Sequence, residues 1–282
     1  MIPALGSGLG YRRELKAAIL EARERIDFVE IVADQFMDSP AQLTELESLR
    51  DVFPVIPHGV GLSIGTIAPL PAEYLRAVKS ICDATRTPYF SEHLAVTRVP
   101  GIDIGHLSPI WFSERALNAT VDNVCRVQDY LGRPLVLETI TYPLAIPGAD
   151  LSQGEFFSRL VDLSGCGVLL DVTNVYVNSV NHHFDPVSFL KDMPLDRVVQ
   201  IHLAGGFWSE GVLVDGHCEP VDDGSWGLLE KLADMIAVRA SIIEQDDKFP
   251  DDPTALIAQV DKARRIIANG KAALEPAMMK SA

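Results

Sequence analysis

The chain has 282 residues, of which 48% are hydrophobic and 22% are charged, a balance that excludes disordered, collagen-like and fibrous proteins. Its 24 basic residues against 39 acidic ones give a net charge of −15, which opposes binding to nucleic acid because a phosphate backbone requires a basic surface. The length fits either two domains or one α/β barrel of about 250 residues.

Eight short apolar runs recur along the chain, and most have the β-branched composition of parallel strands buried on both faces. They span 4–9, 28–33, 53–57, 88–91, 134–137, 167–170, 198–201 and 240–243. Amphipathic helical segments separate them, most clearly at 13–25, 113–131 and 255–268. This alternation predicts an α/β fold, a single-domain (β/α)8 TIM barrel over residues 1–269, followed by a flexible C-terminal tail over 270–282. An open doubly wound sheet is the alternative, but no GxGxxG motif joins a strand to a helix.

The cysteines and the first residues indicate the cellular compartment of the protein. The four cysteines are widely spaced and include no CxxC pair, which favours reduced thiols over disulfides or a zinc knuckle. They are Cys82, Cys125, Cys166 and Cys218. The first residues lack the basic and apolar regions of a signal peptide, and no apolar run reaches the roughly 18 residues of a membrane span. We therefore expect a cytoplasmic protein with no membrane association.

Metal-ligand residue types follow the third to the eighth predicted strands, at the point where each strand ends. In a closed barrel these carboxyl ends meet at one mouth, where catalytic groups of this fold lie. The candidate residues are His58, His93, Glu138, Asp171, Asn174, His202, Asp215, His217 and Glu244.

Four imidazoles and four carboxylates that converge in a half-buried cup require compensation, because unpaired buried charges cost several kcal/mol each. Divalent cations supply it directly. The ligands offer nitrogen and oxygen without thiolate, which favours iron, manganese or zinc in a catalytic site. Nine ligands are too many for one ion and suit a cluster, in which Glu138, midway round the barrel, is the natural bridge.

Each residue also has a simpler interpretation. Asp171 and Asn174 could cap the following helix, the Asp215-Gly216 pair could form a turn, and Glu244 could make a salt bridge at the rim. Taken together, six consecutive strand ends in one register favour a metal site over packing alone. Other histidines are expected outside it: His182 and His183 in a solvated polar loop at 178–185, and His106 in a structural position.

At these motifs the sequence resembles the DUF692 proteins, the multinuclear non-heme iron-dependent oxidative enzymes (MNIO). The segments that carry the resemblance are 58–63 (HGVGLS), 91–94 (SEHL), 170–174 (LDVTN) and 202–205 (HLAG). The resemblance implies a barrel like that of xylose isomerase and two or three iron ions per chain, in mixed Fe(II)/Fe(III) states, held by the nine residues above. The chain departs from the family pattern at Thr139, Gly216 and Gln245, none of which is a proposed ligand.

The resemblance also implies an activity. Characterised members modify cysteine residues of ribosomally synthesised precursor peptides in natural-product biosynthesis, often with a small partner protein that binds the peptide leader. The substrate thiolate would bind one iron, and O2 on another would give a ferric-superoxo species that abstracts hydrogen from the cysteine β-carbon. The peptide substrate and its product stay open.

Two other functions fit the same residues. A zinc or manganese hydrolase or sugar isomerase could use this cup, although the missing basic surface opposes a DNA substrate and no lysine lies beside these strand ends. A non-catalytic module that binds a peptide or a metal would be indifferent to O2.

Overall fold

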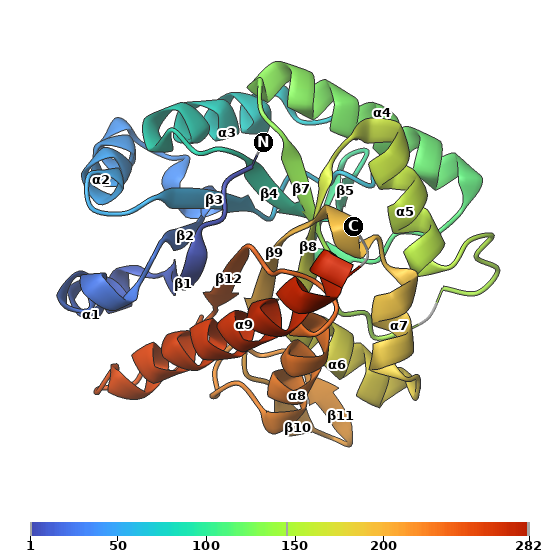
Figure 1. Cartoon of the computed structure of the whole chain (residues 1–282). Coiled ribbons are helices and arrows are strands. Elements are labelled where there is room, and N and C mark those ends of the chain that lie inside the picture. The colour runs from blue at the N-terminus through green and yellow to red at the C-terminus, as the bar shows by residue number, and fades with distance from the viewer. Residues whose placement is uncertain (1, 145, 281–282) are drawn as a thin grey trace.

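Eight parallel strands close into a barrel, as the alternating pattern predicts (Figure 1). The strands are β1 (Gly6–Tyr11), β2 (Val29–Val32), β3 (Val55–Gly59), β4 (Phe90–His93), β7 (Leu135–Glu138), β8 (Gly167–Asp171), β9 (Val198–Leu203) and β12 (Ala240–Ile243). Closure is made by β1 and β12, where Gly6 pairs with Ala240. The computed structural model describes residues 2–144 and 146–280, and side chains as far as residue 274.

Helices follow the strands and ring the outside of the barrel (Figure 1). They are α1 (Lys16–Glu21), α2 (Pro40–Arg50), α3 (Ala72–Thr85), α4 (Glu114–Leu131), α5 (Gln153–Ser164), α6 (Val172–His182), α7 (Pro186–Asp192), α8 (Asp223–Ala233) and α9 (Thr254–Lys280). Short 3-10 turns lie at Arg13–Leu15, Arg23–Arg25, Ala33–Phe36 and Leu195–Arg197. In the described residues, none of these helices is both long and apolar enough to traverse a bilayer.

Local sequence explains where these helices begin and end. The Ser113 side chain accepts a hydrogen bond from the Ala116 N–H at the start of α4, and the helix ends at Gly132 with a φ of 67°. α5 repeats the arrangement with Ser152 and Gly165. Capping oxygens satisfy free N–H groups, and glycine adopts the left-handed end conformation at low cost.

The lower part of the barrel lumen is filled by apolar side chains. Phe28, Ile56, Val136 and Leu169 pack there with the ring of Tyr89, and all are fully buried. Above this floor the inward residues become polar. The site therefore rests on a packed base that gives no passage through the barrel.

The structure corrects several details of the predicted elements. Two antiparallel hairpins were not expected: β5 (Val96–Val99) with β6 (Ile102–Ser108), and β10 (Phe207–Ser209) with β11 (Val212–Val214). The helix expected at 13–25 is a short helix between two 3-10 turns. The loop expected at 178–185 is wrong over its first five residues, because α6 continues to His182.

The last helix also continues beyond the expected end of the domain. α9 runs to Lys280, and Gly270 is buried against the Ala233 carbonyl, where a Cβ would lie 2.4 Å away. Helical backbone therefore covers most of the segment expected to be a tail. Residues 281 and 282 lie outside the described residues, and the mobility of this segment stays a prediction.

Candidate metal centre

The nine predicted residues lie at one end of the barrel. Seven of them line a single cup of about 290 Å³, and the other two, Asp171 and His202, are fully buried beside it. The seven are His58, His93, Glu138, Asn174, Asp215, His217 and Glu244. Strand ends that are distant in sequence thus meet as the closed barrel requires.

A first group of ligand atoms comes from β3, β4 and β7. His58 Nε2 and His93 Nε2 lie 3.0 and 3.1 Å from the same oxygen, Glu138 Oε2, and 3.4 Å from each other. The other ring nitrogens are held by neutral groups: His58 Nδ1 is 3.0 Å from Ser91 Oγ, and His93 Nδ1 is 2.9 Å from the Gly59 carbonyl oxygen. Both rings are therefore fixed with Nε2 toward Glu138, and these three residues could hold one ion.

A second group uses the other oxygen of Glu138. His202 Nδ1 is 3.1 Å from Glu138 Oε1 and 3.1 Å from Glu244 Oε2. Together with Asp171, these residues offer ligand atoms that all lie within 4.8 Å of one another. Because Glu138 belongs to both groups, its carboxylate is placed to bridge two ions.

The three remaining predicted residues that line the cup form what we call the third group, namely Asn174, Asp215 and His217, and the last two are 16% and 18% exposed. His217 Nε2 is 2.9 Å from Asp215 Oδ1, and its Nδ1 is 3.0 Å from Asp246 Oδ2. Asn174 donates from Nδ2 to the Thr139 carbonyl, which leaves its Oδ1 free. These side chains come from α6 and from the segment after β11 rather than from strands of the barrel.

Buried oxygens without hydrogen bonds support ion binding. Among the described side chains, six buried polar atoms have no hydrogen-bond partner, and five belong to predicted ligands. These five are Glu138 Oε2, Asp171 Oδ2, Asn174 Oδ1, Asp215 Oδ1 and Glu244 Oε2. Several approach imidazole nitrogens at about 3 Å without hydrogen-bond geometry, as ligand atoms directed at a common ion do. The donor set therefore fits divalent cations.

Asp171 caps the following helix, as its simpler interpretation predicts, but uses only one of its two oxygens to do so. Its Oδ1 accepts a hydrogen bond of 2.8 Å from the Asn174 N–H and so caps α6, while Oδ2 stays unpartnered. One carboxylate can thus cap a helix and bind an ion. Glu244 does not pair with a lysine or arginine of the described residues and lies buried beside His202 and His217.

The charges of the cup perturb one another. Burial would lower the pKa of His93, but the charge of Glu138 and the contacts with Glu92 raise it to about 9. Burial also opposes ionisation of Glu138, yet the surrounding imidazoles hold its pKa well below the ordinary value. Burial and the charges of Asp215 and Glu138 raise the pKa of Asp171 well above its usual range. Such opposite shifts are typical of functional sites.

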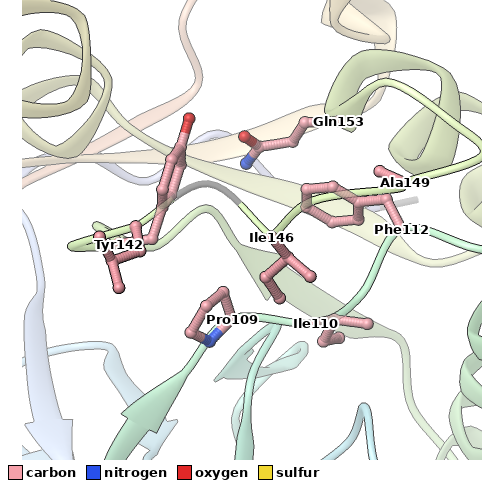
Figure 2. Close-up of a pocket in the computed structure, with 8 residues that line it drawn as sticks. Pro109, Ile110, Phe112, Tyr142, Ile146, Ala149 and Gln153 are labelled. Atoms are coloured by element: carbon pink, nitrogen blue, oxygen red, sulfur yellow. The ribbon is translucent and has the colours of Figure 1, made fainter. Parts of the chain in front are cut away.

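An apolar cavity of about 190 Å³ adjoins the cup (Figure 2). Pro109 and Ile110 form one wall, Phe112 and Tyr142 line two others, and Gln153 extends over it. A space of about 10 Å³ between this cavity and the cup is lined by Ile110 and Tyr142, which also line the cavity, and by Glu138 of the cup.

Sequence reasoning missed residues that support the ligands. Glu30 and Gln200 point into the lumen below His202, and Asp246 contacts His217. Period-two alternation gives a signal for Gln200, two residues before His202 on β9. Of the other histidines, His106 is exposed on β6, while His182 is half-buried at the end of α6, with Nε2 2.8 Å from the Tyr142 carbonyl oxygen.

Solved structures with this fold include a xylose isomerase domain protein from Planctomyces limnophilus and a D-psicose 3-epimerase from Clostridium cellulolyticum H10. Each has a TM-score of 0.57, at 13% and 12% identity, and the matches cover 96% and 97% of this chain and 98% of each of those chains. At such identity they show the fold alone, a barrel of the xylose isomerase kind, as predicted.

Sequence comparison identifies the family. A UPF0276 protein of Caulobacter vibrioides is 36% identical over 273 residues, covering 95% of this chain and 96% of that protein. A UPF0276 protein of Acaryochloris marina is 34% identical, covering 87% and 89%. The model of the family described as "RiPP precursor modification enzyme MbnB/TglH/ChrH" matches residues 6–268. The chain therefore belongs to this family of enzymes that modify the precursors of ribosomally made peptides, as the resemblance indicated.

Proposed function

We propose that this protein is an iron-dependent oxidase that uses O2 to modify cysteine residues of a ribosomally synthesised precursor peptide. The observation that carries the proposal is the set of five unpartnered buried oxygens, which lie among four imidazoles at one end of the barrel. Family membership supports the peptide substrate.

Each group of side chains would hold one ion. His58, His93 and Glu138 would hold the first, and Glu138 with Asp171, His202 and Glu244 the second. Asn174, Asp215 and His217 would hold a third, so the chain would bind two or three irons. Bound iron would supply the thiolate affinity and the one-electron chemistry that oxidation of a cysteine by O2 requires.

The cup would position the substrate and limit water. Its volume of about 290 Å³ admits a side chain rather than a folded domain. Val32, Val60, Leu107 and Ile140 form apolar parts of its walls, beside the ligand residues, Arg12 and Asp246. These apolar walls would keep water from the reacting carbon, and the ligand groups would hold the cysteine sulfur beside them.

The surroundings of the cup favour a peptide over a small free metabolite. Apolar side chains lie exposed on segments that follow barrel strands, namely Ile102 at 63%, Trp111 at 53% and Trp208 at 63% exposure. Because these segments leave the carboxyl ends of barrel strands, they lie at the same end of the barrel as the cup, and exposed apolar groups there favour a macromolecular contact. A small partner that binds the peptide leader would complete the substrate complex.

Metal analysis and a peptide assay test the proposal. Protein purified without oxygen from iron-supplemented cells should contain two to three irons per chain by elemental analysis. It should then consume O2 and change the mass of a Cys-containing precursor peptide, whereas a Cys→Ser peptide should remain unchanged.

The outcomes separate the alternatives. Zinc or manganese at similar stoichiometry, with activity independent of O2, would point to a hydrolase or isomerase. A metal-loaded protein that binds the peptide and leaves it unaltered would be a binding module. A chain that takes up no metal contradicts the proposal itself.

A further inference from the structure

A buried polar network lies between the apolar floor of the barrel and the second group of ligand atoms. It consists of Glu30 on β2, Gln200 and His202 on β9, and Tyr89 just before β4. All four residues are 3% exposed or less. Because β2 and β9 are not neighbours in the barrel, the network crosses the lumen.

Glu30 is its central acceptor. Glu30 Oε1 lies 2.8 Å from His202 Nε2, and Gln200 Nε2 donates to Glu30 Oε2. Tyr89 donates its hydroxyl to Gln200 Oε1, which fixes the orientation of the amide. Gln200 Nε2 also lies 2.8 Å from His202 Nε2 and could donate there only if that nitrogen carried no hydrogen. The Nε2 lone pair would then face Glu30 Oε1 at 2.8 Å, so we assign a hydrogen to Nε2 that is donated to Glu30.

This assignment sets the tautomer of His202. With the Nε2 hydrogen donated to Glu30, Nδ1 is the nitrogen that would give its lone pair to an ion, and it lies 3.1 Å from both Glu138 and Glu244. Metal-bound histidines in proteins commonly donate their second N–H to a carboxylate, which orients the ring and raises its basicity. At the corresponding nitrogen, His58 contacts the Ser91 hydroxyl and His93 the Gly59 carbonyl, with the Glu92 carboxylate farther from His93 at 3.7 Å.

The free-energy cost of burying Glu30 indicates that this residue has a role other than stabilising the fold. Among the described residues, its only ion-pair partner is His202, although the layer beneath is apolar. A buried carboxylate with so little compensation destabilises a fold that an apolar residue would serve as well. We propose that Glu30 is a positioning residue that holds His202 with Nδ1 toward the second metal position, while Gln200 and Tyr89 hold Glu30.

The proposal rests on the proposed metal centre and is tested without peptide or O2. The metal-free chain would be titrated with Zn²⁺, and the ions retained after dialysis against a chelator would be counted. For Glu30→Gln we expect one ion per chain to bind about 10- to 100-fold more weakly, as loss of a metal ligand's hydrogen-bond partner typically causes, with the remaining ions unchanged. In the Zn²⁺-loaded wild-type protein, ¹⁵N NMR should find the His202 hydrogen on Nε2.

A matched pair of hydroxyl deletions separates positioning from general destabilisation. Tyr89→Phe and Tyr74→Phe each remove one buried tyrosine hydroxyl, but the Tyr74 hydroxyl contacts Asp34 and Glu92, which lie outside the network. Only Tyr89→Phe should weaken binding of the ion that Glu30→Gln affects, and by a smaller factor than Glu30→Gln does. Tyr89→Phe is the milder change and also tests the inference if Glu30→Gln does not fold.

Three results would overturn this inference. Wild-type protein that loads Zn²⁺ beside a Glu30→Gln variant that loads it equally well overturns this inference and leaves the metal centre standing. Equal losses in Tyr89→Phe and Tyr74→Phe likewise refute it. Wild-type protein that takes up no Zn²⁺ overturns both this inference and the metal centre.

Discussion

Asp246 and His217 lie in contact at the opening of the cup, with Oδ2 3.0 Å from Nδ1. The other Asp246 oxygen accepts hydrogen bonds from the Arg12 guanidinium, which anchors the carboxylate to the end of β1. The third group of ligand atoms therefore depends on a residue outside the predicted ligand set, and Asp246 is itself 43% exposed.

We expect Asp246→Asn to weaken metal binding at the third group alone. The amide keeps the size of the side chain but loses the charge that orients His217, and loss of such a partner typically costs 10- to 100-fold in affinity. Elemental analysis after mild chelation should find about one ion fewer than in wild type. A protein that loses every ion at once would contradict three separable groups.

Glu138→Gln should affect the first and second groups together. Both oxygens of Glu138 approach imidazole nitrogens, and an amide cannot offer two anionic oxygens. We expect loss of at least two ions per chain and of peptide oxidation. Glu230→Gln, an exposed change on α8, is the control and should match wild type. Full metal content in Glu138→Gln would exclude the bridging role.

Metal uptake should depend on pH. His93 has a pKa of about 9, and the neighbouring carboxylates outweigh burial to raise the pKa of His202 and His217. These rings are therefore protonated in the metal-free protein at pH 7, and an ion must displace their protons. Affinity for Zn²⁺ should rise from pH 6 to about pH 9, with proton release visible in weakly buffered solution. A Zn²⁺ affinity that stays constant over this pH range would contradict the raised pKa values of these histidines.

The buried cysteines should react slowly. Burial raises the pKa of Cys82 to about 12 and of Cys166 to about 11. Because the thiolate is the reactive form, alkylation of these two in the folded protein at pH 8 should be far slower than in urea. The unfolded thiols ionise near pH 9 and the folded ones only near 11 to 12, so stability should fall as pH rises through this interval. Mass spectrometry of the labelled protein checks the first expectation and denaturant titration the second.

Gly205 should be sensitive to substitution. A Cβ there would lie 1.8 Å from the Glu219 carbonyl oxygen, so Gly205→Ala must displace the segment that leads from β9 to Asp215 and His217. We expect a loss of about 1–3 kcal/mol in stability together with weaker metal binding at the third group. Gly227→Ala, in α8 with open space around it, should instead stabilise by up to about 1 kcal/mol. Thermal unfolding compares the pair, and equal effects would refute the steric argument.

Much of the barrel and its mouth could be predicted because a parallel strand places its last residue at a defined end. The eight strands and the convergence of residues such as His58 and Glu138 follow from that geometry. Glu30 could not be recognised in the same way, because it is the one polar residue of β2 and has no polar neighbour two residues away, as Gln200 has in His202. The two hairpins were not predicted because their short, largely exposed strands lack a clear apolar pattern.

The pairing of β1 with β12 joins the earliest strand of the chain to the latest. Glu244 follows β12, so the second group of ligand atoms lacks a member until almost the whole barrel has been synthesised. A nascent chain on the ribosome therefore presents only partial coordination to passing cations. An ion that requires all four residues of the second group can therefore be held only after the last strand has joined the barrel.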